Sequence, residues 1–194
     1  MKTVDLQARD LLLTPPSTAD LHEIARACQD PDIAAWVAVP QPYAHSDAEF
    51  FLEHVVRPGW RDGTQASWTV RRSTDDPLVA MVGLHDIGAR SGELGFWTAP
   101  WARREGVMSA AVQAVLDHAF DADGLGLERV LWQAYVGNWP SRRVAWRAGF
   151  RLEGTIRLEA VHRGVRRDSW VGTILAGDPR EPNEPWPREA PAPA

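Results

Sequence analysis

The stretch Trp101-Ala-Arg-Arg-Glu-Gly-Val-Met-Ser-Ala-Ala111 decides how the rest of the chain is arranged. It follows the apolar run Leu94–Thr98, which is typical of a strand, and it opens an alanine-rich helix that we expect to reach Phe120. The first turn of a helix presents unpaired backbone N–H groups at the positive end of the helix dipole. Because Arg103 and Arg104 stand at this turn, the sequence predicts a binding site for a phosphorylated ligand there.

Composition limits the class of protein. The 194 residues suffice for one domain with a substantial core, and the formal net charge of −5 argues against a nucleic-acid partner. We expect no membrane partner, because no apolar run is long enough to span a bilayer and the first residues lack the apolar core of a secretory signal. The single cysteine, Cys28, excludes an internal disulfide and a cysteine-based metal cluster, so we expect a cytoplasmic protein without a metal.

Upstream of the central stretch, the pattern predicts a strand, two helices and three further strands. Ser17–Asp20 and Ser46–Glu49 have the pattern of capping boxes, and we expect the second helix to end at Arg57-Pro58-Gly59. Asp30-Pro31 ends the first helix or starts a turn, and Trp36–Tyr43 is too rich in proline for regular structure. The four predicted strands are Leu11–Thr14, Ala66–Arg72, Leu78–Ile87 and Glu93–Thr98. Short loops between the last three favour an antiparallel meander.

Downstream, the pattern continues with a long helix, a strand, a short helix and two strands. The predicted ranges are Glu105–Asp121 for the long helix, Arg129–Tyr135 for the strand, Asn138 to Gly149 for the short helix, and Phe150–Arg157 and Asp168–Leu175 for the last two strands, with a basic turn at 162–167. A helix between two strands of one sheet requires a parallel crossover. We expect one domain over 1–177 and, from Asp178, a Pro-rich tail that is disordered or loosely held with Trp186 as its anchor.

Three blocks of sequence, in order, resemble one family. Arg103-Arg-Glu-Gly106-Val-Met108 is similar to the pattern Gln/Arg-x-x-Gly-x-Gly/Ala, with Met108 at the last position, where we expect its side chain to enter the core. The run from Asn138 through Ser141 and Gly149-Phe150 to Gly154 is similar to Asn-x-x-Ser-x-x-x-x-x-x-x-Gly-Phe-x-x-Glu-Gly, and Glu93-Leu-Gly-Phe-Trp97 resembles Glu-x-Gly-Tyr-Trp. Together they identify residues 9–175 as similar to the GNAT superfamily of N-acetyltransferases, in its RimJ/RimL-type branch.

This resemblance implies a fold, a reaction and a donor site. The fold would be a mixed α/β, GNAT-like, mostly antiparallel central sheet with one parallel β-α-β crossover and helices on both faces. The reaction would be transfer of an acyl group, acetyl from acetyl-CoA, to a primary amine (a protein N-terminus or a small-molecule amine) by direct attack in a ternary complex. The residues expected to bind acetyl-CoA are Phe96, Trp97, Thr98, Arg103, Arg104, Glu105, Gly106, Val107, Met108, Asn138, Ser141 and Arg142. The first three would offer backbone groups to the pantetheine arm.

The resemblance also suggests which residues carry the chemistry. Many family members have a tyrosine acid where this chain has Ala145, so Ser141 near the start of the last helix is the candidate acid. Glu93 is the candidate base for the incoming ammonium, directly or through water, since a carboxylate at the mouth of a partly buried cleft can have its pKa raised toward the working pH. His85 and Glu159 remain alternative bases.

The acceptor side is less defined. The early helices and the segment after them form the acceptor wall in the family, and here they suggest Trp36 and Tyr43, together with His85 on a strand, as residues that contact the substrate. A peptide N-terminus, an aromatic amine and an amino sugar all stay open, as do a longer acyl donor and a homodimer. The alternative function is a CoA-binding domain without catalysis, used for sensing or assembly.

Overall fold

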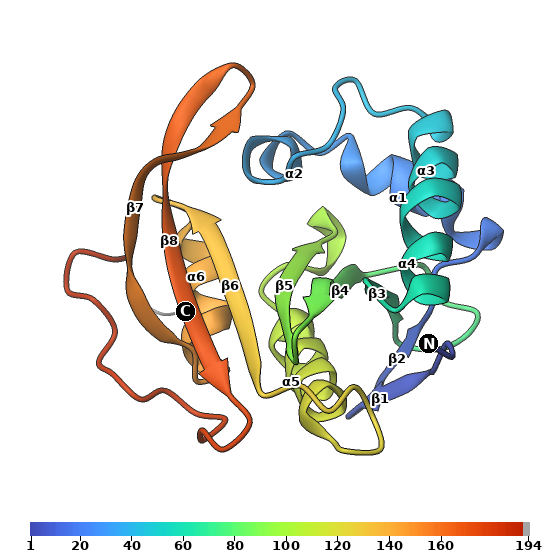
Figure 1. The fold of residues 1–194 in the computed structure, drawn as a ribbon. Coiled ribbons are helices and arrows are strands. Elements are labelled where there is room, and N and C mark those ends of the chain that lie inside the picture. The colour runs from blue at the N-terminus through green and yellow to red at the C-terminus, as the bar shows by residue number, and fades with distance from the viewer. Residues whose placement is uncertain (192–194) are drawn as a thin grey trace.

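Residues 1–191, which the computed structural model describes, form an eight-stranded sheet with helices on both faces (Figure 1). The strand order is β1-β2-β3-β4-β5-β6-β8-β7, and only β5 and β6 are parallel neighbours. The mostly antiparallel sheet with one parallel crossover, predicted from the sequence, is therefore confirmed. Within residues 1–191, none of the helices combines the length and the apolar character needed to cross a membrane.

The elements follow the sequence closely at the centre of the chain. The strands are β1 (Leu6–Ala8), β2 (Leu11–Thr14), β3 (Ala66–Arg71), β4 (Ala80–Gly88), β5 (Ser91–Thr98), β6 (Arg129–Tyr135), β7 (Arg151–His162) and β8 (Val165–Leu175). The α-helices are α1 (Leu21–Cys28), α2 (Pro31–Trp36), α3 (His45–Phe51), α4 (Arg57–Asp62), α5 (Val107–Phe120) and α6 (Trp139–Arg147). Short 3-10 turns cover Thr18–Asp20 and Pro100–Ala102, and a π-helical segment covers Leu52–Val56.

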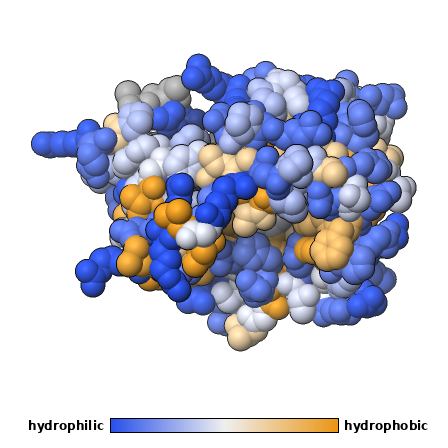
Figure 2. Space-filling model, turned by 90° about the horizontal axis from the view of Figure 1, so that it is seen from above, coloured by the Kyte–Doolittle hydropathy of each residue, from blue (hydrophilic) through white to orange (hydrophobic). Residues whose placement is uncertain are grey.

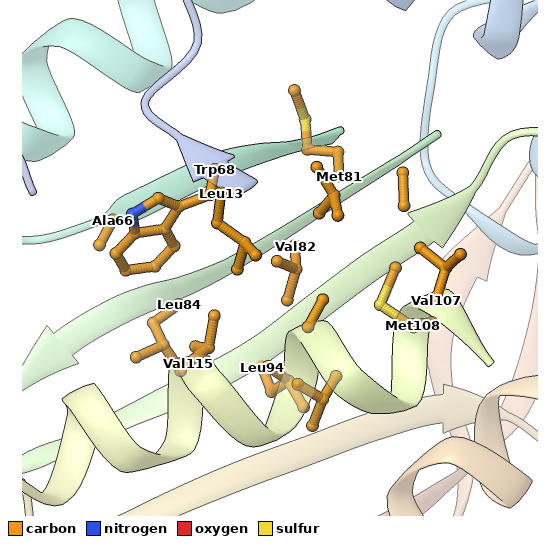
Figure 3. Close-up of a cluster of buried hydrophobic side chains, with 14 of the residues drawn as sticks. Leu13, Ala66, Trp68, Met81, Val82, Leu84, Leu94, Val107, Met108 and Val115 are labelled. Carbon is orange, nitrogen blue, oxygen red and sulfur yellow. The ribbon is translucent and has the colours of Figure 1, made fainter. Parts of the chain in front are cut away.

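Helix α5 packs against one face of the sheet and forms the centre of the core. Figure 3 shows Leu84 of β4 and Leu94 of β5 meeting Val115 of α5, and all three side chains are buried. Burial of an aliphatic side chain of this size stabilises the fold by about 1.5–3 kcal/mol relative to its exposure. Met108, in the first turn of α5, is also buried in this cluster, so its predicted orientation into the core is confirmed.

On the opposite face, the first helices differ from the prediction in two places. Asp30 starts a helix: its side chain accepts the N–H of Ile33 at 3.0 Å, and Pro31 occupies the first turn of α2, where a missing N–H costs nothing. Helix α3 has its N-cap two residues earlier than the predicted Ser46, at Ala44, whose N–H donates to Asp47 at 2.7 Å. The predicted capping box at Ser46–Glu49 is thus wrong in position.

The second helix also does not end at Arg57-Pro58-Gly59. It passes through the π-helical segment into α4 and ends at Gly63, whose φ of 76° gives the left-handed cap that glycine favours. Pro58 is tolerated because it lies in the first turn of α4. Proline in this segment lies in the first turn of α4 and does not end the helix, so the predicted helix end at Arg57-Pro58-Gly59 is wrong.

Strands β7 and β8 extend beyond the sheet as a two-stranded arm, longer than predicted. The expected six-residue basic turn is instead mostly strand, with Ala160 facing Arg167 and His162 facing Val165, and the chain reverses at Arg163 and Gly164 with positive φ at both. In Figure 1 the tip of this arm reaches α2. There Nε2 of His162 lies 3.1 Å from the carbonyl oxygen of Ala34, which also accepts from the Arg163 guanidinium.

The arm exposes large apolar side chains between charged ones. Its exposed large side chains are Ile156, Leu158, Val161 and Val165, with 46–60% of their surface accessible. Figure 2, which views the molecule from above, shows strongly hydrophobic side chains gathered on the left, the side on which the arm lies in Figure 1.

After β8 the chain returns along α6. The Asn183 side chain donates to the carbonyl of Gly149 at 2.9 Å, and Nε1 of Trp146 donates to the carbonyl of Glu184 at 2.7 Å. The ring of Trp186 packs edge-on against that of Trp146, with centroids 5.2 Å apart. Residues 178–191 therefore contact α6 at several points besides Trp186.

Candidate active site

The parallel strands β5 and β6 are paired over only part of their length. Their register runs from Ser91–Leu94 against Arg129–Trp132. Beyond that point, Gly95–Thr98 stay paired to β4 alone, and Gln133–Tyr135 stay paired to β8 alone. The two strands therefore part, as Figure 1 shows, and leave backbone N–H and C=O groups on their facing edges for an extended ligand to pair with.

Helix α5 begins beside the end of β5 with an open N-terminus. Its N-cap is Gly106, at φ 76°, and a glycine has no side chain with which to cap the first N–H groups. A Cβ on Gly106 would meet no atom of residues 1–191 within 4 Å, so the space in front of the helix is open. The 14-residue helix adds its dipole to these N–H groups, which makes the turn suited to a diphosphate.

The two arginines at this turn behave differently. Arg104 is exposed, whereas Arg103 pairs with Asp30 and donates to Oδ2 of Asp32 at 2.9 Å. Burial opposes ionisation of Asp30, but the hydrogen bond from Arg103 and the N–H of Ile33 outweigh it and lower the pKa of that carboxyl. A diphosphate bound in front of α5 would interact with the Arg103 guanidinium while that group still pairs with Asp30 and Asp32 at the start of α2.

The other residues predicted to bind the donor lie either at this turn, as Glu105, Val107 and Met108 do, or on α6, as Arg142 does. Glu105 pairs with Arg72, and Val107 is buried like Met108, so only their backbone groups face the open end of α5. Arg142 lies over the ring of Trp170, with its Cζ 4.6 Å from the ring centroid, and burial lowers the pKa of its guanidinium. The side chain of Arg142, which belongs to α6, is thus held against β8 by stacking on Trp170.

Ser141 is tied to the point where the strands part. Its N–H donates to Oδ1 of Asn138 at 3.2 Å, which confirms Asn138 as the cap of α6. Its Oγ accepts the indole N–H of Trp132 at 2.9 Å. Trp132 faces Leu94 in the last pair of the β5–β6 register. Since its oxygen already accepts a hydrogen bond, the Ser141 hydroxyl keeps its own hydrogen for donation to another group.

Glu93 flanks the same point from the other face of the sheet. Leu94 packs against α5, so its strand neighbours Glu93 and Gly95 point to the opposite face. Glu93 is opposite His85 on β4, and its Oε1 lies 3.8 Å from Nε2 of His85. Burial raises the pKa of Glu93; His85 lowers it, and the nearby carboxylates of Asp86 and Glu159 raise it further.

A pocket of about 410 Å³ opens on this second face. Its floor is one row of small residues on three neighbouring strands, Ser67, Gly83 and Gly95, which the antiparallel register places side by side. Helices α1 and α3 and the 37–43 segment form its walls. The floor was not predicted, although glycine inside two adjacent strands is a signal of backbone that something approaches closely.

The residues predicted to contact the substrate lie in or beside this pocket. Tyr43 and His85 line it. Trp36 reaches the loop after β6, where one of its ring carbons lies 3.6 Å from the place a Cβ on Gly137 would take. Trp36 thus lies outside the lining of the pocket and joins α2 to the loop after β6.

Solved structures with the same fold include N-acetyltransferases. The chain superposes on RimJ of Mycobacterium smegmatis, solved in complex with CoA-disulfide, with a TM-score of 0.77 and 24% identity over 90% of this chain and 87% of that one. It superposes on RimL, the ribosomal L7/L12 α-N-protein acetyltransferase solved with CoA, with a TM-score of 0.79 and 16% identity over 89% and 98% of the two chains. At these identities the likeness establishes the fold.

Sequence relatives agree with that class. YdaF of Bacillus subtilis, whose name assigns it provisionally to ribosomal N-acetylation, is 32% identical over 138 residues, 67% of this chain and 72% of YdaF. The ribosomal-protein-serine acetyltransferase of Escherichia coli is 31% identical over 85 residues, which cover 43% of this chain and 46% of that relative. The match to the E. coli enzyme thus spans less than half of its length.

Residues 10–151 match the family model described as Acetyltransferase (GNAT) domain, and this match covers more than half of the chain. The chain belongs to the GNAT family of acetyltransferases. It is an acyl-CoA-dependent N-acetyltransferase, as the three sequence blocks indicated, and this membership favours the enzyme over the non-catalytic CoA-binding domain.

Proposed function

We propose that the protein transfers acetyl from acetyl-CoA to a primary amine, either a protein N-terminus or a small-molecule amine, by direct attack in a ternary complex. One observation carries this proposal: Glu93 and Ser141 flank the parting of β5 and β6 from opposite faces of the sheet. A thioester held in that gap would have a base on the side of the pocket and a hydroxyl donor on the side of α6.

The donor would lie along elements already described. The backbone amides of Gly106, Val107 and Met108 would bind the diphosphate, with Arg103 and Arg104 adding charge. The unpaired edge at Phe96–Thr98 would pair with the amide groups of the pantetheine arm. This supports the donor-binding residues expected from the sequence, with Asn138 acting through its cap on Ser141.

The chemistry then follows from proton positions. The amine nitrogen attacks the thioester carbonyl carbon, an N–C bond forms, and the C–S bond breaks. Glu93 takes the proton that the amine loses, directly or through water, and its raised pKa brings it closer to that of a useful base at neutral pH. The Ser141 hydroxyl donates a hydrogen bond to the departing thiolate, and any proton that it passes on is replaced by the second proton lost from the attacking nitrogen, so the products are the amide and the CoA thiol; the start of α6 favours the negative charge on the thiolate.

The test is a panel of amines and N-terminal peptides with acetyl-CoA, scored by release of free CoA thiol. Glu93→Gln and Ser141→Ala are compared with wild type and with Glu128→Gln, an exposed carboxylate paired to Arg90 that serves as the matched control. We expect slow turnover for the first two variants only. If both turn over normally, the assigned roles are wrong; if acetyl-CoA binds but no amine releases thiol, the proposed reaction is wrong.

Two further parts of the proposal come from the sequence. A cytoplasmic location suits the one cysteine, Cys28, which is buried and unpaired with another cysteine. A homodimer is proposed through the arm, whose Ile156, Leu158, Val161 and Val165 are exposed in the monomer. Sedimentation at micromolar concentration would show a dimer mass for wild type and a monomer for Leu158→Asp; a monomeric wild type contradicts this part.

A further inference from the structure

We infer that the acceptor is a primary amine carried by a compact apolar or aromatic group, which the pocket beside Glu93 binds. This inference rests on the proposed function and narrows its substrate class. Two sources could supply such a group: an arylalkyl amine, or a peptide whose first residue has a large apolar side chain. Both present the same chemistry to the pocket.

The walls of the pocket are apolar nearly throughout. They consist of side chains from α1, α3 and the segment between them: Ile24, Cys28, Val37, Val39, Phe51 and Val55. Burial raises the pKa of the Cys28 thiol to about 12, and burial also raises the pKa of Tyr43, so both groups are neutral at physiological pH. A group entering here exchanges water for uncharged, mostly hydrocarbon surroundings.

Several of the polar side chains in the lining have partners within the chain. Gln65 donates to Oγ of Ser67 at 3.0 Å, and Oδ2 of Asp47 accepts the N–H of Ala44. No lysine or arginine lines the pocket within residues 1–191. The several hydroxyls of an amino sugar would lose water here with few polar groups to replace it, which costs binding free energy for each group.

The depth of the pocket comes from its floor. Because Ser67, Gly83 and Gly95 carry little or no side chain, the sheet surface is recessed between the Met81–Trp97 pair on one side and the His85–Glu93 pair on the other. A cavity of about 150 Å³ is enough to hold benzene in a protein core. At about 410 Å³ this pocket has room for an aromatic ring with a short alkyl linker.

The polar end of the pocket sets the orientation. His85 lies in the lining, and its Nε2 is 3.8 Å from Oε1 of Glu93, next to the parting of β5 and β6. An apolar group in the pocket would therefore place an attached amine toward Glu93 and the thioester. The amine must be joined to the apolar group by a short linker, because Glu93, the carboxylate next to the reaction site, lies at this end of the pocket.

The same volume has one rival occupant. Phe96 and Trp97, which we propose to lie along the pantetheine arm, also belong to the lining, so a long acyl chain on the donor is the other group of suitable chemistry. We favour the acceptor because about half of the lining comes from α1, α3 and the 37–43 segment, on the face that carries Glu93, whereas Phe96 and Trp97 lie at its edge toward the parting of the strands. The experiment separates these occupants.

The first measurement compares amines with acetyl-CoA and the wild-type protein. The probes are 2-phenylethylamine, ethanolamine, glucosamine and spermidine, and two tripeptides that begin with Phe or with Ser. From the area of a buried ring, we expect kcat/KM about 10- to 100-fold higher for 2-phenylethylamine than for ethanolamine, with the Phe peptide exceeding the Ser peptide if peptides are the source. Equal or greater turnover of the polar amines overturns the inference while leaving the proposed function intact. No thiol release with any amine would instead contradict the proposed function.

The second measurement fills the pocket. Val55→Trp places a large ring into the lining, and Leu175→Trp, at an exposed position at the end of β8, is the matched control. We expect Val55→Trp to raise KM for 2-phenylethylamine at least 10-fold and to raise KM for methylamine by much less, with both values unaffected in Leu175→Trp. If Val55→Trp alters only the preference between acetyl-CoA and hexanoyl-CoA, the pocket holds the acyl chain and the inference is wrong. Equal melting temperatures of the two variants verify that Val55→Trp is folded.

Discussion

Oε1 of Glu93 lies 3.8 Å from Nε2 of His85, on facing positions of β5 and β4. The pair is half-buried at the edge of the apolar pocket, so two effects act on the carboxyl group in opposite directions. Burial, the larger effect, raises the pKa of Glu93, and the imidazole of His85 lowers it. The net rise makes this carboxylate a better base than an exposed glutamate, because a base is most effective when its pKa lies near the working pH.

The pH dependence of catalysis should report this pKa. We expect kcat/KM of wild type to fall as the pH decreases through the raised pKa of Glu93, and Glu93→Gln to reduce kcat by about 10²- to 10⁴-fold and to remove that acid limb. Glu159→Gln is the matched control: it removes a carboxylate that raises the pKa of Glu93, so it should shift the limb to lower pH with little change in kcat. A larger loss in Glu159→Gln than in Glu93→Gln would reverse the assignment.

The Glu93→Gln substitution should also stabilise the fold. Since the folded-state pKa of Glu93 lies above its ordinary value of 4.5, the stabilisation from the protonated form is complete below pH 4.5 and is lost as the pH rises through the folded-state pKa. Glutamine resembles the protonated form at every pH. We therefore expect Glu93→Gln to melt at a higher temperature than wild type at pH 8, with the difference shrinking toward pH 4.5. Identical melting curves at pH 8 would contradict the raised pKa.

Arg103 should serve both stability and donor binding. Arg103→Ala leaves Asp30, whose side chain is only 13% exposed, without its guanidinium partner, which we expect to cost about 1–3 kcal/mol of unfolding free energy. It should also raise KM for acetyl-CoA several-fold with little change in kcat. Denaturant unfolding and steady-state kinetics measure the two effects.

Arg104→Ala separates these roles, because Arg104 is exposed at the same turn. We expect a rise in KM for acetyl-CoA without loss of stability. If Arg103→Ala lowers stability but leaves KM unchanged, its guanidinium belongs to α2 alone and does not contact the diphosphate.

Elements whose signals are local were predictable from the sequence. Strand β6 was predicted with its observed bounds, since Arg129–Tyr135 is an apolar run between polar turns. Helix α6 followed from Asn138, whose side chain does cap it. By contrast, α2 was missed because Asp30-Pro31 both ends one helix and starts the next, and the pattern cannot separate those roles.

Features that depend on contacts between distant segments were not predictable. The pocket floor exists because the register of three strands aligns Ser67, Gly83 and Gly95, and each of them alone is an ordinary small residue in a strand. The bond between Trp132 and Ser141 likewise joins two elements through packing. The arm was underestimated because its exposed strands lack the alternation that a half-buried strand shows.

Because Trp132 donates a hydrogen bond to Ser141, we expect substitutions of both residues to lower kcat, the serine variant more than the tryptophan variant. Ser141→Ala removes the donor to the thiolate and leaves the indole N–H of a buried Trp132 unpaired, so kcat should fall about 10- to 100-fold and stability by about 1–3 kcal/mol. Trp132→Phe keeps the serine but removes the group that orients it, and should lower kcat by less. Stopped-flow thiol release with several leaving thiols measures the effect. A kcat of Ser141→Ala equal to wild type at all pH values would leave the serine with only a packing role.

The segment after β8 should stabilise the domain without taking part in donor binding. Ending the chain at Gly177 removes the acceptor of the Trp146 indole N–H, the ring of Trp186 and the amide of Asn183, so we expect a loss of about 2 kcal/mol or more and a lower melting temperature. Trp186→Ala should produce part of that loss, and Arg188→Ala, at an exposed position in the same segment, should produce none. Calorimetric titration should show that residues 1–177 still bind acetyl-CoA, because the parting of β5 and β6 and the start of α5 lie within them. An unchanged melting temperature on truncation would mean that the contacts along α6 contribute nothing to stability, as expected for a loosely held tail.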